Sequence, residues 1–181
     1  PVGVPEPEEK DDTGASALAE DGLIPTAVRA IKSVRPEIAV ITDVCLCAYT
    51  KHGHCGVLAD SGTIDHHRSA ALLGRMAAAH AAAGADVVAP SAMMDGQVRA
   101  IREALDSSGF GETAIMSYAA KFASSFYGPF RDAVGSSSAL GKGNKFTYQM
   151  DPANSDEALW EVGLDLQEGA DMVMVKPGMP Y

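Results

Sequence analysis

The sequence predicts an α/β fold built on a parallel sheet, on the evidence of alternating apolar patterns and a short repeated motif. Continuous apolar runs, typical of buried parallel strands, alternate with segments in which apolar residues recur at helical spacing. Gly84-Ala85-Asp86 and Gly169-Ala170-Asp171 each connect a predicted helix end to an apolar strand. Strands that alternate with helices form parallel sheets with right-handed crossovers. Four such strands are predicted, and the pattern alone leaves open an incomplete eight-stranded barrel or a doubly wound sheet.

The individual elements follow one another after a polar start. Residues 6–21 are rich in Glu, Asp and Gly and are predicted to form a solvated loop. The Gly/Ser-rich stretch 135–145 is predicted to be a mobile loop. Asn154 with Glu157 three residues later resembles a capping box at a helix start. Helices are predicted over 23–35, near 65–83, from Val98 to Leu105 and from Asn154 onward, and strands over Ile38–Val44, Val87–Ala89, Ala114–Tyr118 and Met172–Val175.

Composition sets the size of the fold and narrows its partners. The 181 residues, of which 46% are hydrophobic, suit one domain with a sizeable core, and we expect residues 1–181 to form a single domain. The formal net charge of −10 argues against nucleic-acid binding, which requires a basic surface. The sequence contains no apolar run of about 18 residues or more, so no membrane span is expected.

Two lysines follow predicted strands at their carboxyl ends, where the active sites of both candidate architectures lie. Lys176 directly follows the apolar strand 172–175, and Lys121 comes shortly after the strand 114–118. Burial beside a second cation favours neutral lysine, which is the nucleophile that forms a Schiff base with a ketone. The alternative is that each lysine simply closes a strand at the surface, as most lysines do.

Three cysteines lie within eleven residues, Cys45, Cys47 and Cys55, in a loop that also holds His52 and His54. An odd number of cysteines in one cluster favours metal ligation over a disulfide framework, and thiolates are good zinc ligands. Three protein ligands with a water would make a catalytic site, and four a structural one. The cysteines could instead be small buried hydrophobic residues. Either histidine could be a fourth ligand, a partner of a ligand or a substrate contact.

A third candidate is Arg131, at the end of the segment Tyr127-Gly128-Pro129-Phe130-Arg131. A planar guanidinium binds a carboxylate through two parallel hydrogen bonds, so Arg131 could hold an acidic substrate. The alternative is a surface ion pair with Asp132 or another acid.

These segments resemble the signature blocks of the aminolevulinate dehydratase family, in that family's order, and the resemblance runs from about Gly3 to the end of the chain. It implies a (β/α)8 barrel, usually assembled into homo-octamers. It also implies a hydro-lyase that condenses two 5-aminolevulinate molecules into porphobilinogen, with loss of water, for tetrapyrrole synthesis. The blocks are DVCLCAYTKHGHCGVL (43–58), APSAMMDGQV (89–98), MSYAAKFASSFYGPFRDA (116–133), YQMDPAN (148–154) and MVKPGMPY (174–181).

The resemblance also implies individual roles. Lys176 matches the lysine that binds the first substrate, which becomes the propionate side of the product, and Lys121 matches the lysine for the second. Cys45, Cys47 and Cys55 match the three zinc ligands of the zinc-dependent branch. Lys145 stands where many relatives have arginine. Glu161 matches a glutamate that binds an allosteric magnesium in many members, although a solvated helix carboxylate is the alternative. The substrate contacts implied by the resemblance are Asp43, Ser91, Tyr127, Arg131, Lys145 and Gln149.

Compared with that family, the chain is expected to lack the N-terminal arm, the first strands and the last two strands, leaving about four central strands of a barrel. The resemblance implies a cytoplasmic protein, expected in a bacterium, with a plastid as the alternative location. Two other functions remain open. A class I aldolase on the same barrel would explain one lysine but not the cysteine loop. A zinc-stabilised binding module would bind metal without imine chemistry.

Overall fold

Four parallel strands form one sheet, in a computed structural model that describes residues 3–133, 139–140 and 143–181. The strands are paired in chain order, β1-β2-β3-β4, so each lies beside the next one along the sequence. The bounds of the strands are Ile41–Val44 for β1, Val87–Pro90 for β2, Ala114–Lys121 for β3 and Met172–Lys176 for β4.

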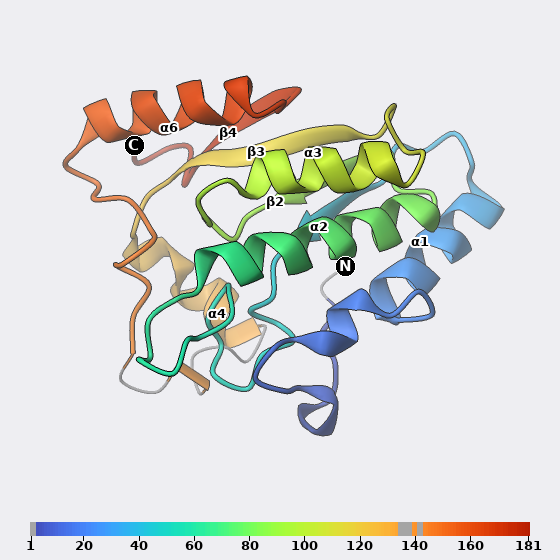
Figure 1. Ribbon diagram of the computed structural model, residues 1–181, viewed down its shortest axis with the longest axis horizontal. Helices are drawn as coiled ribbons and strands as arrows, with labels where there is room; N and C mark the ends of the chain where they lie inside the picture. Colours follow the sequence, from blue (N-terminus) through green and yellow to red (C-terminus); the bar gives the residue numbers. More distant parts are fainter. Residues whose placement is uncertain (1–2, 134–138, 141–142) are drawn as a thin grey trace.

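The helices that connect the strands cover one face of the sheet. Helices α2 and α3 pack side by side against the first strands, and α6 lies over β3 and β4 (Figure 1). A doubly wound sheet reverses its strand order and carries helices on both faces. The consecutive order with one covered face is therefore that of an arc of a (β/α) barrel. The helices are α1 (Leu23–Val34), α2 (His66–Ala82), α3 (Gln97–Ser107), α4 (Gly128–Ala133) and α6 (Ser155–Gln167).

The core lies between the sheet and these helices, and it explains why the strands read as apolar runs. Along β1, Thr42 and Val44 are buried towards the helices, whereas Ile41 and Asp43 face the other side of the sheet. Leu73 and Met76 of α2 belong to the main apolar cluster. The members contributed by the strands and α3 include Val44, Val88, Ile115, Val98, Ile101 and Leu105.

Two predicted strands differ from the structure at one end. Residues 38–40 were expected to begin the first strand, but β1 starts at Ile41, which pairs with Val87 at the start of β2. The earlier residues have no strand beside them, and Val40 bonds to Asp86 instead. Conversely, β3 extends beyond Tyr118 to Lys121, because its pairing with β4 continues past a bulge.

The polar segments also differ in part from the predictions. Residues 6–21 contain two short 3₁₀ helices, Pro7–Glu9 and Ala15–Leu18, and Ala17 is buried in the core. Residues 135–138 and 141–142 of the predicted loop 135–145 lie outside the described residues. At the start of α6, the Asn154 side chain accepts a hydrogen bond from the Glu157 backbone N–H at 3.2 Å, as a helix cap does.

The repeated Gly-Ala-Asp motif has the same structural role both times it occurs. The Asp86 backbone N–H donates to Val40 O at 3.0 Å, and the Asp86 carboxylate accepts from Val40 N at 2.7 Å. Asp171 makes the same reciprocal pair with Ile115, at 3.0 and 2.8 Å. Each aspartate therefore fixes the amino end of the neighbouring strand and so sets the strand register.

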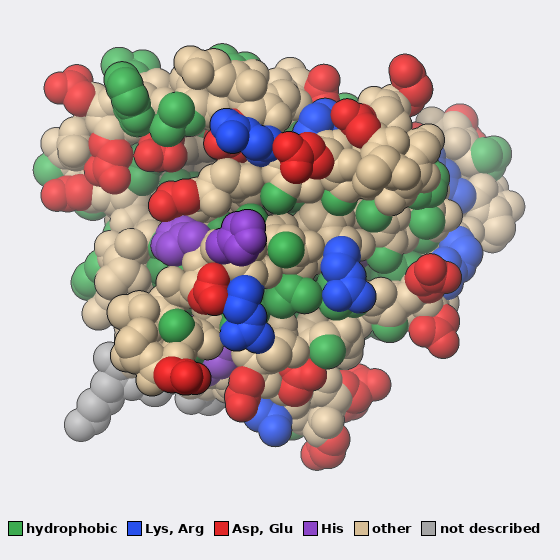
Figure 2. All heavy atoms as spheres, in the orientation of Figure 1, with side chains coloured by type: hydrophobic (Ala, Val, Ile, Leu, Met, Phe, Trp, Pro, Cys, Tyr) green, Lys and Arg blue, Asp and Glu red, His purple; other side chains and the backbone are tan. Residues whose placement is uncertain are grey.

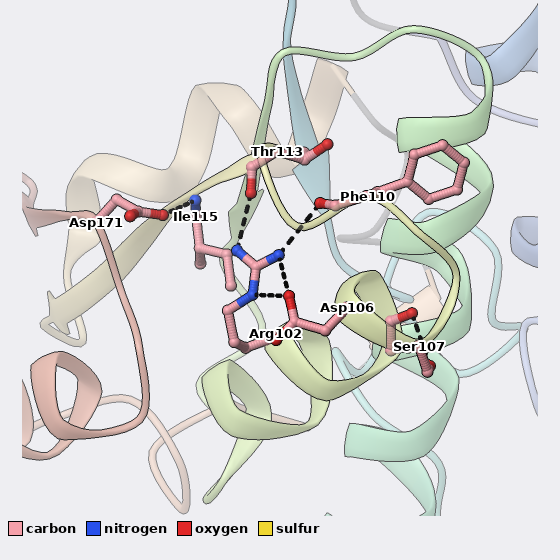
Figure 3. A network of polar contacts seen from close by, with 8 residues as sticks. Arg102, Asp106, Ser107, Phe110, Thr113, Ile115 and Asp171 are labelled. Atoms are coloured by element: carbon pink, nitrogen blue, oxygen red, sulfur yellow. Dashed lines mark hydrogen bonds and ion pairs between the residues drawn. The ribbon is translucent and has the colours of Figure 1, made fainter.

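Arg102 of α3 holds the turn that leads into β3 at the same end of the sheet (Figure 3). Its guanidinium donates to the carbonyl oxygens of Phe110 and Thr113 and pairs with Asp106 at 2.8 Å. Gly169 has a φ of 104°, which favours glycine. A Cβ atom at this position would also lie only 3.3 Å from the Arg102 side chain, so there is little room for a larger residue. In barrels this end of the strands serves stability, and the opposite end carries the chemistry.

His80 of α2 is fully buried, and neither of its ring nitrogens has a hydrogen-bond partner among the described residues. Burial lowers the pKa of His80 from 6.5 to about 4. Between these pH values the unfolded chain takes up a proton that the folded chain does not, so stability falls as the pH falls from 6.5 towards 4. The full loss is about 3 kcal/mol. We expect His80→Leu to remove this acid sensitivity.

Urea midpoints of the full-length protein at pH 7 and pH 4.5 would measure the effect. His67→Leu, on an exposed position of the same helix, is the matched control and should keep the wild-type pH dependence. A His80→Leu protein that loses as much stability as the wild type between these two pH values would contradict the assignment.

The outer surface mixes both signs of charge. On the face seen in Figure 2, acidic side chains are spread over the molecule with Lys and Arg among them. No helix within the described part of the chain is long and apolar enough to cross a membrane.

Candidate active site and metal centre

The carboxyl ends of the strands open into one cleft of about 1250 Å³, which residues of α1 and α4 also line. All residues predicted above as catalytic, substrate-binding or zinc-binding line this cleft. Glu161 lies apart from them, in a second pocket. The cleft therefore collects side chains from all four strand ends, and from the segment around Gln149, in one place.

The three cysteines converge although Cys55 is eight or more residues from the other two. Their sulfur atoms all lie within 4.8 Å of one another. Within the described ranges this is the only group of three His, Cys, Asp or Glu side chains whose ligand atoms come so close. Zinc binds thiolates at about 2.3 Å, usually in a tetrahedron, so three sulfurs gathered in this way fit one zinc ion and leave a fourth position.

Glycines allow the cysteine loop to turn back on itself. Gly53 has a φ of 69°, in the left-handed region that favours glycine. A side chain on Gly56 would begin 2.5 Å from Ser69 Oγ and 2.9 Å from Met94 Sδ, so the loop can pack against α2 only without one. This close packing is what brings Cys55 back to the cysteines that follow β1.

The cysteine cluster divides its protons unequally. Hydrogen bonds from the Cys45 and Cys47 thiols lower the pKa of Cys55 well below its ordinary value. Hydrogen bonds to Cys47 and Cys55, together with burial, raise the pKa of Cys45 well above its ordinary value. For Cys47 a hydrogen bond with Cys45 lowers the pKa, but the bond to Cys55 and burial outweigh it, and the pKa rises to about 12. Cys55 is therefore the first thiolate of the cluster.

Lys145 is the positive partner of this thiolate. It is buried, and its Nζ donates to Cys55 Sγ at 3.1 Å. Burial lowers the pKa of Lys145, but the negative charge on the cysteines raises it by more, so the net pKa lies above its ordinary value. The structure thus places Lys145 against the cysteines, while Gln149 lines the cleft nearby.

The two lysines are direct neighbours across the sheet. Lys121 ends β3, Lys176 ends β4, and the two residues are paired in the register of these parallel strands. Lys121 is buried, and its ammonium donates to Ser91 O at the end of β2. Lys176 is half-buried and faces the same cleft. Two primary amines therefore stand side by side at the open end of the sheet.

Asp43 is the acid that faces this pair from β1. Desolvation of the carboxyl group by the surrounding protein raises the pKa of Asp43, and a hydrogen bond from Ser91 lowers it. The positive charges of Lys121 and Lys176 also lower it, whereas the charge of Cys55 raises it. The net direction is upward, so Asp43 is a carboxyl group suited to exchanging a proton with neighbours in the cleft.

Tyr127 connects the lysines to Arg131. Its buried ring lies 5.9 Å from Lys121 Nζ and 5.8 Å from the guanidinium carbon of Arg131. Its hydroxyl donates to Lys176 O at 3.2 Å. Arg131 itself is half-buried and lines the cleft, where its guanidinium is available to a ligand carboxylate.

The histidines of the cysteine loop are engaged elsewhere. His54 Nδ1 lies 3.1 Å from the Tyr148 hydroxyl, which also accepts from Cys55 N at 3.4 Å. His52 Nε2 lies 3.2 Å from Asp12 O. Neither histidine belongs to the group of converging ligand atoms. Tyr148 therefore orients the loop, a role that the sequence analysis did not assign.

Glu161 lines a separate pocket of about 380 Å³ beside α6. Burial raises the pKa of Glu161, and the charges of Asp165 and Asp95 raise it further. Gln149 lines both this pocket and the main cleft. The pocket therefore concentrates negative charge close to the segment that carries Lys145 and Gln149.

Taken together, the arc of parallel strands, the paired lysines and the thiol cluster define an α/β protein of the barrel class, with two candidate amine nucleophiles and a group of cysteines that could hold a metal ion. The sequence model of the delta-aminolevulinic acid dehydratase family matches residues 2–181. The chain belongs to the delta-aminolevulinic acid dehydratase family.

Individual relatives agree with this assignment. The delta-aminolevulinic acid dehydratase of Archaeoglobus fulgidus is 54% identical over 175 residues, which cover 97% of this chain and 53% of the relative. That of Escherichia coli K12 is 56% identical over 171 residues, covering 94% of this chain and 52% of the relative. The chain spans about half the length of the curated relatives it matches.

A solved structure supports the fold as well as the family. The delta-aminolevulinic acid dehydratase (porphobilinogen synthase) of Toxoplasma gondii ME49, in complex with the reaction product porphobilinogen, superposes with a TM-score of 0.94 at 48% identity. The match covers 96% of this chain and 49% of that one.

Proposed function

We propose that this chain is the central part of a porphobilinogen synthase, which joins two 5-aminolevulinate molecules with loss of water in tetrapyrrole synthesis. On this proposal the four strands belong to an eight-stranded barrel, and residues outside the 181 supply the other strands. The family assignment and the product bound to the Toxoplasma gondii relative support the reaction. We further propose a homo-octamer in the cytosol, as the resemblance to the family implies.

The observation that carries the proposal is the pairing of Lys121 with Lys176 at neighbouring strand ends, in one cleft with the cysteine cluster. A reaction that joins two identical ketones through imines needs two amines within reach of each other. A class I aldolase needs only one lysine and gives no reason for the three thiols.

The proposed mechanism begins with the lysines. Lys176 Nζ attacks the ketone carbon of the first 5-aminolevulinate, the oxygen leaves as water, and an imine forms. Lys121 does the same with the second molecule. Each imine withdraws electrons from the neighbouring carbon. Loss of a proton beside the Lys121 imine gives an enamine, whose carbon bonds to the imine carbon on Lys176, and the amine of the first substrate bonds to the imine carbon on Lys121. Each lysine then leaves its carbon as a free amine, so the net loss is the two waters released when the imines formed. Asp43, whose charge interacts with both lysines, would exchange protons near the two nitrogens.

Positive side chains hold the substrates in place. Arg131 lines the cleft beside Tyr127 and would bind a substrate carboxylate through two hydrogen bonds. Lys145 and Gln149 also line the cleft, and the Ser91 hydroxyl bonds to Asp43 in the same space. Fixing both molecules in this way supplies the orientation that a two-substrate reaction requires.

Zinc is the metal that the donor set favours. Cys45, Cys47 and Cys55 would hold it, since converging thiolates suit zinc, whereas magnesium prefers oxygen ligands. Zinc at this position would supply a Lewis acid within the cleft. The direct test of the function is to incubate the full-length protein with 5-aminolevulinate as the sole organic substrate and to assay porphobilinogen. An absence of product with zinc-loaded, folded protein would reject the proposal.

We propose that Glu161 binds an allosteric magnesium ion in the second pocket. The charge gathered around Glu161 favours a cation there, and water molecules would complete the coordination, as magnesium often requires. Added magnesium should then raise the activity of the full-length protein and favour its larger oligomer. Glu161→Ala should abolish both responses and leave the zinc content unchanged.

Activity at graded magnesium concentrations, together with size-exclusion chromatography, would measure these responses. Glu103→Ala, on an exposed position of α3, is the control and should respond like the wild type. An undiminished magnesium response in Glu161→Ala would place the ion elsewhere.

A further inference from the structure

Tyr118 of β3 lies between Lys121 and Lys176. Its position three residues before Lys121 would not predict that the two side chains share a face of the sheet. Residues three apart on a regular strand point to opposite faces of the sheet. Between Ser117 and Ala120, however, the pairing with β4 shifts by one residue, as in a β-bulge. Tyr118 follows the regular alternation of the strand, and the bulge turns Lys121 onto the same face, so that both line the cleft.

The Tyr118 ring is in contact range of both amines. Its centroid lies 5.5 Å from Lys121 Nζ and 5.6 Å from Lys176 Nζ. The face of an aromatic ring attracts a cation within about 6 Å of its centroid. One ring is therefore shared by two positive groups that would otherwise only repel each other.

A second ring extends the arrangement. Tyr127 stands between Lys121 and Arg131, at 5.9 and 5.8 Å. The order along the cleft is thus Lys176, Tyr118, Lys121, Tyr127, Arg131, with cations and rings in alternation. Lys121, at the centre, is flanked by a ring on each side.

We infer that Tyr118 is a positioning residue for both lysines: its ring sets the places of the two nitrogens in the cleft and stabilises the positive charge that each carries as a protonated imine. The inference rests on the proposed function, in which both lysines form imines. A lysine side chain is long and flexible, so a shared contact that restricts both nitrogens reduces the freedom lost when two substrates must meet.

The proposal separates the ring from the hydroxyl of Tyr118. In the full-length, zinc-loaded protein, Tyr118→Phe keeps the ring and should keep kcat close to the wild-type value. Tyr118→Leu removes the ring and should lower kcat by roughly 5- to 30-fold, the range expected from the loss of a partly desolvated cation–π contact. Borohydride trapping with 5-aminolevulinate should slow at both Lys121 and Lys176 in Tyr118→Leu, whereas Tyr127→Leu should slow it mainly at Lys121.

A spectroscopic signature tests the contact without any substrate. In protein labelled with ¹³C at the lysine Cε, a ring close to the ammonium shifts the signals of Lys121 and Lys176 upfield. Both shifts should persist in Tyr118→Phe and vanish in Tyr118→Leu, with the exposed Lys51 as internal reference. Loss of both shifts only in Tyr118→Leu supports the ring contact even if no porphobilinogen forms, in which case only the proposed function fails. Unchanged signals in folded Tyr118→Leu, or equal defects in the Phe and Leu variants, would overturn the inference.

Discussion

Replacement of Lys176 by Ala is expected to lower porphobilinogen formation by a factor on the order of a thousand or more, as removal of the nucleophile does in other enzymes that act through covalent intermediates. Lys176 faces the cleft directly beside Lys121, so its loss removes one of the two amines that the reaction requires. Lys176→Arg should be equally inactive, because a guanidinium keeps the positive charge but does not form an imine.

Steady-state rates of the full-length variants would measure this effect. Lys51→Ala removes an exposed lysine from the cysteine loop and serves as the control, with activity close to the wild type. Substantial activity in Lys176→Arg would show that the residue acts through its charge, and would contradict its role as a nucleophile.

Replacement of Cys47 by Ala is expected to remove most of the bound zinc and most of the activity. Loss of one of three converging thiolates leaves two protein ligands, and the affinity should fall by more than the roughly 10- to 100-fold typical when only an outer partner of a ligand is lost. Cys47 is the least buried of the three, so its truncation should disturb the packing less than that of Cys45 or Cys55.

Atomic absorption on protein dialysed against buffered zinc would give the metal content per chain. Ser61→Ala, in the exposed turn that follows the loop, is the matched control and should bind zinc like the wild type. Unchanged zinc in a folded Cys47→Ala protein would contradict the cysteine site.

The strand ends are the part of the site that the sequence could predict. A lysine after an unbroken apolar run, or a cysteine after a predicted strand, must lie at the carboxyl edge of a parallel sheet, and Lys121, Lys176 and Cys45 do lie there. The apolar patterns that predict individual strands and helices do not distinguish a barrel from a doubly wound sheet. This choice follows from the strand order, which depends on contacts between residues far apart in the chain.

The side chains that the sequence analysis missed depend on local irregularity or on long-range contacts. Tyr118 and Lys121 share the cleft face only because of the bulge between them, which breaks the two-residue period on which strand prediction depends. Tyr148 contacts His54 and Cys55, more than 90 positions away, through a hydroxyl whose partners no local pattern could show. Similarly, the pairing of Lys145 with Cys55 depends on how the two segments fold together.

Borohydride trapping of the imines tests the central claim, that Lys121 and Lys176 both act as nucleophiles, most directly. The full-length protein would be treated with 5-aminolevulinate and borohydride, digested and analysed by mass spectrometry. The predicted result is a substrate-derived mass on Lys176 at low substrate concentration, joined by one on Lys121 when the second site fills. Label on neither lysine, in protein that still forms porphobilinogen, would contradict the imine mechanism.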